Sequence, residues 1–548
     1  MDLNDQLLQS SQRSPQASRR EFLVGAGTVG LAAAGATIAA RALAGTSQLT
    51  ASPSQGGRAV ASRQVRFLSA RGKPTRADWA ALTRRLSTHK LLRPGEKGYG
   101  QAKQLFEPQF DALEPAGIAY CAGAGDVAEC LNFVRRFQLP VRARSGGHNY
   151  AGWSSVTGGL VIDVSAIHFV RTGSDTIRVG SGTDLIHFYS ELAARGLAVP
   201  GGSCPTVGIA GLALGGGVGV LSRLYGLTCD NMTAVQVVTA DGSVLDCDGS
   251  HNSDLYWACR GGGGGNFGVA TSFTFRTHQL TELCVFYLSW PWSRAADVVG
   301  AWQSWAPHAP DALWSTLHLT ADFGGQPELS VSGTYVGSQS DLTTQLDDLF
   351  QRAGANPSLT SITEESYLDA MLTEAGCATI PLGACHTGAG GQLARVPAFA
   401  KSDFFTKPLN RRGIRALLSG IEKLGAISGA QGGGGSIAFD ALGGAVNRVQ
   451  PAATAFVHRD ALFLAQYYTS WLWPGTRSGV ANQQSWLRSY YNSLHPHASG
   501  QAYQNYIDPE LTGWQQAYYG ANYPRLRQVK AKYDPQNLFS FPQSIGSA

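Results

Sequence analysis

Gly201-Gly-Ser-Cys-Pro-Thr-Val-Gly-Ile-Ala-Gly-Leu-Ala-Leu-Gly-Gly-Gly-Val-Gly219 is a glycine-dense stretch that holds one cysteine, Cys204, immediately before a proline. A second such stretch lies upstream, Arg142-Ala-Arg-Ser-Gly-Gly-His-Asn-Tyr150. Glycine lets the backbone approach a ligand closely, and runs of free N–H groups form concave sites for anions such as a pyrophosphate. We therefore interpret the two stretches as parts of one cofactor cradle.

The residues around these stretches alternate between helical and strand patterns. Helices are expected over 126–136 and 184–195, and strands over 140–144, 160–164, 176–179, 234–238, 242–246 and 270–276. The loop 145–148 then follows a strand end, which is where open α/β sheets bind their ligands. Near residue 280 the glycine clusters thin out, apart from 432–435, and we expect a second domain with strands over 283–290, 328–335 and 455–468.

Composition excludes several classes of protein. The 548 residues carry 43 basic and 38 acidic side chains, a net charge of +5, and no basic run with interleaved aromatics follows the N-terminal segment, so nucleic acid is not an expected partner. The nine cysteines contain no CxxC spacing, and no zinc or other metal site is expected. Because nine is odd, at least one cysteine is left outside any scheme of disulfides.

The N-terminus has the pattern of a twin-arginine export signal over residues 1–44. Arg19 and Arg20 precede an uncharged stretch over 22–40, and Ala42-Leu-Ala44 follows as a cleavage pattern. The alternative is an uncleaved membrane anchor, but the many Gly and Ala residues make the stretch weakly hydrophobic, which favours export without stable membrane insertion. Residues 45–114 are expected to form a flexible lead and an N-terminal helical part.

Five motifs, in order along the chain, together resemble the berberine-bridge-enzyme-like flavoproteins of the vanillyl-alcohol-oxidase superfamily. They are Arg144-Ser-Gly-Gly-His-Asn149, Cys204-Pro-Thr-Val-Gly208, Arg260-Gly-Gly-Gly-Gly-Gly-Asn-Phe-Gly268, Tyr503-Gln-Asn-Tyr506, and Lys532-Tyr-Asp-Pro-Gln-Asn-Leu-Phe539 with Gln543-Ser-Ile545. The resemblance implies an α+β fold with a PCMH-type, two-subdomain FAD-binding domain over 115–280. It also implies an inserted α/β substrate domain over 281–500, an antiparallel sheet covered by helices, and a C-terminal segment over 501–548 that completes the FAD domain and active site.

The same resemblance implies a bicovalent FAD, bonded to His148 through the 8α-methyl group and to Cys204 through C6. An imidazole and a thiolate are chemically able to add to an electron-poor ring. The alternatives are a histidine that only hydrogen-bonds, a structural cysteine, or a His/Cys metal pair, for which no further ligands are suitably spaced. The other expected cofactor-binding residues are Arg144, Ser145, Gly146, Gly147, Asn149, Val207, Gly208, Gly211, Gly215, Asn231, Gly268, Val269 and Asn505.

Tyr506 is the expected catalytic base, since the tyrosine at this motif position in relatives deprotonates a substrate hydroxyl while hydride moves to flavin N5. A free phenol has a pKa near 10, so Tyr506 needs support, for which Tyr503 and Asp440 are the candidates. Tyr506 as core packing and Asp440 as a surface carboxylate remain alternatives. Val207 is a position where a small valine in relatives admits O2 to the flavin, although it could equally only pack beneath the ring.

The resulting prediction is a secreted FAD-linked oxidase that takes hydride from a substrate C–H and reduces O2 to H2O2. Export favours an alcohol or hemiacetal of a sugar or oligosaccharide as the small-molecule substrate. Tyr467, Tyr468, Trp471 and Trp473 are either stacking residues for that sugar or core. Two other functions stay open: oxidation of a glycosylated or polyketide-like metabolite, and a non-redox cyclisation on the flavin scaffold.

Overall fold

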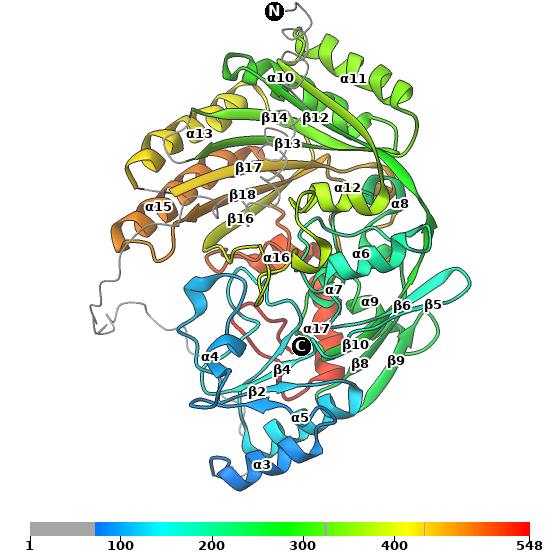
Figure 1. The fold of residues 1–548 in the computed structure, drawn as a ribbon, viewed down its shortest axis with the longest axis vertical. Helices are drawn as coiled ribbons and strands as arrows, with labels where there is room; N and C mark the ends of the chain where they lie inside the picture. Colours follow the sequence, from blue (N-terminus) through cyan, green and yellow to red (C-terminus); the bar gives the residue numbers. More distant parts are fainter. Residues whose placement is uncertain (1–71, 323–325, 432, 548) are drawn as a thin grey trace, which may run out of the picture.

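The structure is a computed structural model that describes residues 72–547, except 323–325 and 432 (Figure 1). The expected export signal over 1–44 and the first part of the expected lead, residues 45–71, lie outside the described residues. Within the described part of the chain, no helix has both the length and the apolar character needed to cross a bilayer.

The first subdomain is a small sheet with strand order β1-β2-β4-β3, in which β4 pairs in parallel with both β2 and β3. Its elements are α3 (Arg76–Arg85), β1 (Leu91–Leu92), α4 (Tyr99–Ala102), β2 (Gly117–Tyr120), α5 (Ala124–Phe137), β3 (Val141–Arg144) and β4 (Leu160–Asp163). Helix α5 packs its apolar side, including Val127 and Leu131, into the core beside the sheet, as the helical spacing of these residues predicts. Strand β3 ends at the loop that carries His148.

The second subdomain is an antiparallel sheet with order β5-β6-β10-β8-β9. Its strands are β5 (Val170–Thr172), β6 (Thr176–Gly180), β8 (Met232–Val238), β9 (Val244–Asp248) and β10 (Val269–Arg276), with β7 (Leu197–Ala198) and β11 (His278–Gln279) paired as a separate two-stranded sheet. Helices α6 (Leu185–Ala193), α7 (Ile209–Gly215), α8 (Ser222–Tyr225) and α9 (Ser253–Ala258) belong to the same region. The glycine-dense stretch thus contains a short helix, α7, which ends where Gly216 and Gly217 take positive φ.

A seven-stranded antiparallel sheet, order β15-β12-β14-β13-β17-β18-β16, forms the other half of the molecule (Figure 1). Its strands are β12 (Glu282–Trp290), β13 (Leu313–Asp322), β14 (Glu328–Tyr335), β15 (Leu359–Ser366), β16 (Ala398–Phe405), β17 (Gly433–Ala441) and β18 (Phe463–Trp471). The helices of this half are α10 (Ala295–Trp305), α11 (Gln339–Ala353), α12 (Tyr367–Glu374), α13 (Arg411–Gln431), α14 (Gly444–Arg448) and α15 (Arg477–Leu494). The predicted α+β class, with an antiparallel sheet covered by helices, is confirmed.

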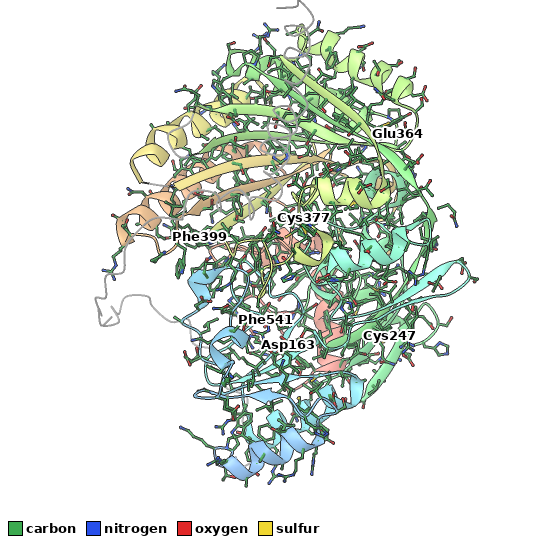
Figure 2. The ribbon with its side chains drawn as sticks, in the orientation of Figure 1. Asp163, Cys247, Glu364, Cys377, Phe399 and Phe541 are labelled. Carbon is green, nitrogen blue, oxygen red and sulfur yellow. A yellow bond between two sulfur atoms is a disulfide. The ribbon has the colours of Figure 1, made fainter. Side chains whose placement is uncertain are left out.

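The two faces of this sheet differ in chemistry. Apolar side chains such as Leu317 and Phe439 point to one face and pack against Trp302, Leu417 and Trp486 of the covering helices. The alternate residues point to the other face, where many are polar. In Figure 2, Phe541 and Asp163 lie in the half of the molecule beneath this sheet. The C-terminal segment, with α16 (Trp514–Tyr519) and α17 (Tyr523–Tyr533), runs back into that half.

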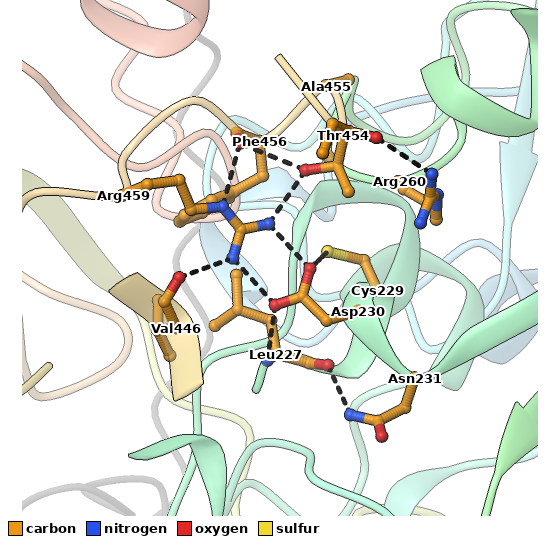
Figure 3. A network of polar contacts seen from close by, with 12 residues as sticks. Leu227, Cys229, Asp230, Asn231, Arg260, Val446, Thr454, Ala455, Phe456 and Arg459 are labelled. Carbon is orange, nitrogen blue, oxygen red and sulfur yellow. Dashed lines mark hydrogen bonds and ion pairs between the residues drawn. The ribbon is translucent and has the colours of Figure 1, made fainter. Parts of the chain in front are cut away.

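One strand prediction is wrong in its extent. A strand was expected over 455–468, but the chain follows an irregular path until β18 begins at Phe463. The physical reason lies in Arg459, whose buried guanidinium pairs in a bidentate manner with Asp230, with N···O distances of 2.7 and 2.8 Å (Figure 3). This ion pair joins the segment between β17 and β18 to the half of the molecule that carries the Cys204 loop, and β18 begins four residues after Arg459.

The nine cysteines all lie in the described residues. Cys377 and Cys385 form a disulfide, which leaves seven free thiols. Six of the seven are buried, and Cys204 is the one that is only partly buried. Cys204 is therefore distinguished from the other free cysteines by its partial exposure, and not only by the odd number of cysteines.

Candidate active site

A cavity of about 310 Å³ lies between the two halves of the molecule. The walls come from the His148 loop, the Cys204 loop, the polar face of the seven-stranded sheet and the C-terminal segment. Sixteen of the eighteen residues predicted for the site line it: Arg144, Ser145, Gly146, Gly147, His148, Asn149, Cys204, Val207, Gly208, Gly211, Gly268, Val269, Asp440, Tyr503, Asn505 and Tyr506. Segments that are remote from one another in the sequence thus share one cavity.

The two glycine stretches touch each other at Gly146 and Gly208. A Cβ added to Gly146 would lie 2.4 Å from the backbone nitrogen of Gly208, and one added to Gly208 would lie 2.0 Å from Ser145 Oγ. Ser145 is itself held by a hydrogen bond from its hydroxyl to the Ser181 carbonyl, 2.7 Å. Only glycine fits this contact, so the side-by-side arrangement of the two loops depends on these two residues.

His148 is held by neighbours from two other segments. Its Nε2 lies 2.8 Å from Thr206 Oγ1, and its ring stacks on Phe106 with centroids 4.0 Å apart. Burial lowers the pKa of His148 to about 3, so the imidazole is neutral at physiological pH and keeps a nucleophilic nitrogen. The residue is also partly open, because one side borders the cavity.

Cys204 lies on the same cavity with its thiol protonated. Burial raises the pKa of Cys204 to about 11, and hydrogen bonds from Thr206 and Val207 offset part of that rise. A neutral thiol is less reactive than a thiolate, so the free side chain is protected from adventitious oxidation. His148 and Cys204 therefore line the same cavity, but the imidazole is a nucleophile as it stands, whereas the thiol must first lose its proton.

Tyr506, Tyr503 and Asp440 come together although they lie on separate segments. The rings of Tyr503 and Tyr506 meet edge to face with centroids 5.0 Å apart. The Tyr503 hydroxyl accepts hydrogen bonds from Gly217 N at 2.8 Å and Asn505 Nδ2 at 3.0 Å, which makes it a fixed support. Burial raises the pKa of Tyr506 well above 10, and the nearby Asp440 carboxylate raises it further.

Asp440 is buried, and its carboxyl group is a weaker acid than that of an exposed aspartate. Burial raises its pKa to about 6, while a hydrogen bond with the Thr316 side chain acts in the opposite direction. The group is therefore ionised at neutral pH but close to its midpoint. This is the property expected of a carboxylate that takes part in proton transfer.

Two predicted cofactor residues, Asn231 and Gly215, are not among the residues that line the cavity. The Asn231 amide donates to the carbonyls of Tyr225 and Leu227, and its oxygen lies 2.8 Å from His278 Nε2, so it shapes a turn. Gly215 lies against Asn505, whose Oδ1 would be 1.9 Å from a Cβ at that position. Gly215 therefore sets the position of Asn505, which lines the cavity, whereas neither Asn231 nor its three partners line it.

Sequence reasoning left several cavity residues without a role. Tyr150 and Gln466 form a hydrogen bond of 2.9 Å, and the Tyr150 ring lies 6.1 Å from that of Tyr506. Tyr468, suggested for stacking, lines the cavity with them, whereas Tyr467 is buried on the opposite face of the sheet. Tyr150 stands two residues after His148, and Gln466 and Tyr468 alternate along one strand, so the period-two pattern of β18 is the signal that could have found them.

Trp471 and Trp473, the remaining stacking candidates, are not on the cavity. Trp471 is buried against Phe399, with ring centroids 4.8 Å apart, and Trp473 is half exposed beyond the end of β18.

The lining fits a large polar cofactor. Arg144 forms a buried ion pair with Asp163, 2.6 Å, yet its Nη1 has no partner within the described residues. Gln504 and Gln543 line the cavity, and each has an amide oxygen without a partner in the same part of the chain. Buried polar atoms are normally paired, so these atoms indicate a ligand with its own polar groups. Glycine backbone on one side and unpaired polar atoms on the other match a flavin dinucleotide.

Comparison with known proteins identifies the family. A model described as FAD binding domain matches residues 115–248, and one described as berberine and berberine like matches residues 502–546. The FAD-linked oxidoreductase YgaK of Bacillus subtilis is 33% identical over 84% of this chain and 97% of its own length. A chitooligosaccharide oxidase of Gibberella zeae is 30% identical over 79% and 87%. The solved structure of Physcomitrella patens BBE-like 1 has a TM-score of 0.76 at 29% identity and covers 84% of this chain and 97% of that one.

The chain therefore belongs to the berberine-bridge-enzyme-like family and is an FAD-linked oxidoreductase, as its five motifs predicted.

Proposed function

We propose that this protein is an oxidase that removes hydride from a CH–OH group of a sugar or oligosaccharide, with O2 as the electron acceptor and H2O2 as the product. The observation that carries the proposal is the shared cavity: Tyr506 and Asp440 line the same space as His148 and Cys204. The likeness to a chitooligosaccharide oxidase supports the substrate class.

The cavity residues divide the work of substrate oxidation. Tyr506 takes the proton of the substrate hydroxyl as its own phenol proton passes to the Asp440 carboxylate, because a buried phenol with a raised pKa does not ionise without an acceptor for its proton. Tyr503, fixed by Gly217 and Asn505, holds the Tyr506 ring in place. Bound FAD supplies the redox chemistry, accepting two electrons with the hydride and passing them to O2.

We further propose that FAD is held by two covalent bonds, to His148 and to Cys204, with the glycine backbone of both loops around it. Val207 lines the cavity three residues after Cys204 and is the position at which O2 would reach the cofactor. Denaturing mass spectrometry tests the linkage. We expect FAD mass on the wild type and on each of His148→Ala and Cys204→Ala, and none on the double variant; retained FAD on the double variant would contradict it.

Oxygen consumption tests the reaction. Purified protein is screened with mono- and oligosaccharides, and with glycosylated and polyketide-like metabolites, while H2O2 is measured in parallel. Uptake of O2 with a saccharide, with one H2O2 formed per O2, is the expected outcome. Turnover of a metabolite without O2 uptake would instead favour a non-redox cyclisation.

We also propose export through the twin-arginine route, on the sequence pattern of residues 1–44. Replacing Arg19 and Arg20 by lysine in the full chain should keep the protein in the cytoplasm of a bacterial host with this pathway. Equal export of the Lys-Lys variant and the wild type would contradict the proposal.

A further inference from the structure

The polar face of the seven-stranded sheet carries two buried side chains that the proposed chemistry does not use. Thr316 and His318 lie two residues apart on β13, so both point to the face that borders the cavity. They are 0% and 1% exposed. Buried polar residues at such a position need partners, and the partners of these two lead to Asp440.

The contacts form a chain across two strands. Thr316 on β13 is paired in register with Asp440 on β17, so their side chains lie on the same face of the sheet, and hydrogen bonding by the Thr316 side chain lowers the pKa of the Asp440 carboxyl group. On its other side, Thr316 Oγ1 lies 3.1 Å from His318 Nε2. A single hydroxyl thus bridges the imidazole and the carboxylate.

The direction of these hydrogen bonds follows from the surroundings of His318. Burial lowers its pKa to about 4, so the ring is neutral and carries one proton. His318 Nδ1 is buried and has no partner within the described residues. An orphaned N–H donor is rarer in protein interiors than an unfilled acceptor, so we assign the proton to Nε2. His318 then donates to Thr316, which leaves the Thr316 hydroxyl proton free for Asp440.

We propose that Thr316 and His318 are positioning residues that orient the Asp440 carboxylate and keep it ionised beside Tyr506. Each donor in the chain polarises the next, which strengthens the final hydrogen bond to the carboxylate. This inference rests on the proposed function in one respect, the role of Asp440 as the proton acceptor for Tyr506.

The other titratable groups around Asp440 do not lower its pKa as the Thr316 hydroxyl does. Tyr506 lines the same cavity and is neutral because of its raised pKa. Glu374, at the end of α12, is buried, and desolvation together with the charges of Asp440 and Glu365 raises its pKa to about 8. Glu374 is therefore protonated at neutral pH and adds no charge there. Among the groups that shift the pKa of Asp440, the Thr316 hydroxyl is the one that lowers it.

The test follows the ionisation of Asp440 in the FAD-loaded protein without substrate. The visible absorption of the bound flavin is recorded between about pH 4.5 and 9, because a charge that appears in the same cavity changes that absorption. We expect a transition near pH 6 in the wild type that Asp440→Asn removes. Asp440→Asn with an unchanged transition would overturn the proposal, since Asp440 would then not be the group that Thr316 controls.

Two pairs of variants separate positioning from a structural role. Thr316→Val removes the hydroxyl at nearly constant shape and should move the transition upward by about one pH unit, while Thr316→Ser should restore it. His318→Leu should move it upward by about half a unit, and His318→Gln, which keeps a donor near the position of Nε2, should restore it. The His318 pair keeps the test decisive if Thr316→Val does not fold.

A transition at the wild-type pH in both Thr316→Val and His318→Leu would overturn the proposal. Because the titration needs no turnover, it is independent of whether a saccharide is oxidised. Where a substrate is in hand, the acidic limb of kcat/KM should move with the absorption transition in each variant. Failure of the proposed function would instead appear as absence of O2 uptake in the wild type.

Discussion

The cavity has two walls that are built in different ways. The wall formed by the His148 and Cys204 loops consists largely of backbone, and the contact of Gly146 with Gly208 leaves no room for a side chain. The opposite wall consists of side chains on the polar face of the sheet, among them Asp440, Gln466 and Tyr468. The first suits a cofactor that is the same in every turnover, and the second suits a substrate and its proton. A wall built from backbone can be predicted from glycine motifs in the sequence. A wall built from side chains cannot, because it depends on which face of a strand points into the cavity.

The largest expected effect falls on the side-chain wall. Tyr506→Phe should lower kcat/KM by about 10²- to 10⁴-fold, because the proton acceptor of the reaction is lost. FAD content should stay at the wild-type level, since Tyr506 supports chemistry rather than the cradle. Steady-state kinetics and flavin absorbance measure the two separately. Tyr490→Phe, whose hydroxyl donates to the Leu417 carbonyl away from the cavity, is the control; equal kinetics in both variants would refute the role of Tyr506.

The next effect concerns the joint between the two halves. Asp230→Asn leaves the buried Arg459 guanidinium without its charged partner, and we expect the free energy of unfolding to fall by about 3–5 kcal/mol. Chemical denaturation measures it. The matched control is Asp348→Asn in the exposed pair with Arg352, which should cost less than about 1 kcal/mol. Similar losses of unfolding free energy in both variants would mean that burial does not set the contribution of the Arg459–Asp230 pair to stability.

The backbone wall is tested by adding one methyl group. Gly208→Ala introduces a Cβ 2.0 Å from Ser145 Oγ and 2.5 Å from Gly146 N, so we expect a loss of about 3 kcal/mol in the free energy of unfolding, with weakened flavin retention. Chemical denaturation and flavin absorbance measure the two effects. Gly300→Ala, in α10 with no atom within 4 Å, is the control and should instead stabilise by about 0.5–1 kcal/mol.

Gly211→Ala sharpens the same comparison. Gly211 lines the cavity, and no protein atom lies within 4 Å of the position that an added Cβ would take, so the fold should tolerate the change. If the space belongs to the cofactor, FAD retention should fall while the stability of the cofactor-free protein does not. Full FAD retention would mean that the cofactor does not approach this glycine.

The last effect is the dependence of the free energy of unfolding on pH at Asp440, which vanishes at low pH. Its pKa is raised from 3.8 to about 6, so the unfolded chain loses this proton first and the associated stability is lost as the pH rises between these values. Asp440→Asn should therefore gain up to about 3 kcal/mol over the wild type at about pH 8 and little at about pH 3.5, as measured by chemical denaturation. Asp78→Asn has the opposite expectation, because capping by Thr75 lowers the pKa of Asp78. A gain for Asp440→Asn that does not depend on pH would contradict the buried-carboxylate account.

Prediction from sequence succeeded where local pattern decides structure. The helix around Val127, the strands on either side of the His148 loop and strand β14 follow from residue pattern, and the five motifs predicted the family. It failed at Arg459, which pairs with the distant Asp230 carboxylate and precedes the start of β18. It also left Thr316 and His318 without any role, because a buried threonine and histidine in a strand have no distinguishing local signal.

The amino-acid sequence by itself determined the family, the cofactor class and the two glycine-dense stretches, since only glycine lets the backbone approach so closely. The tertiary structure decided that Tyr506 and Asp440 share a cavity with His148 and Cys204, and that Asp440 is desolvated enough to titrate near pH 6. Burial and distance between remote segments are properties of the packed chain. They arise only when the sheet folds over the FAD-binding half and closes the cavity between them.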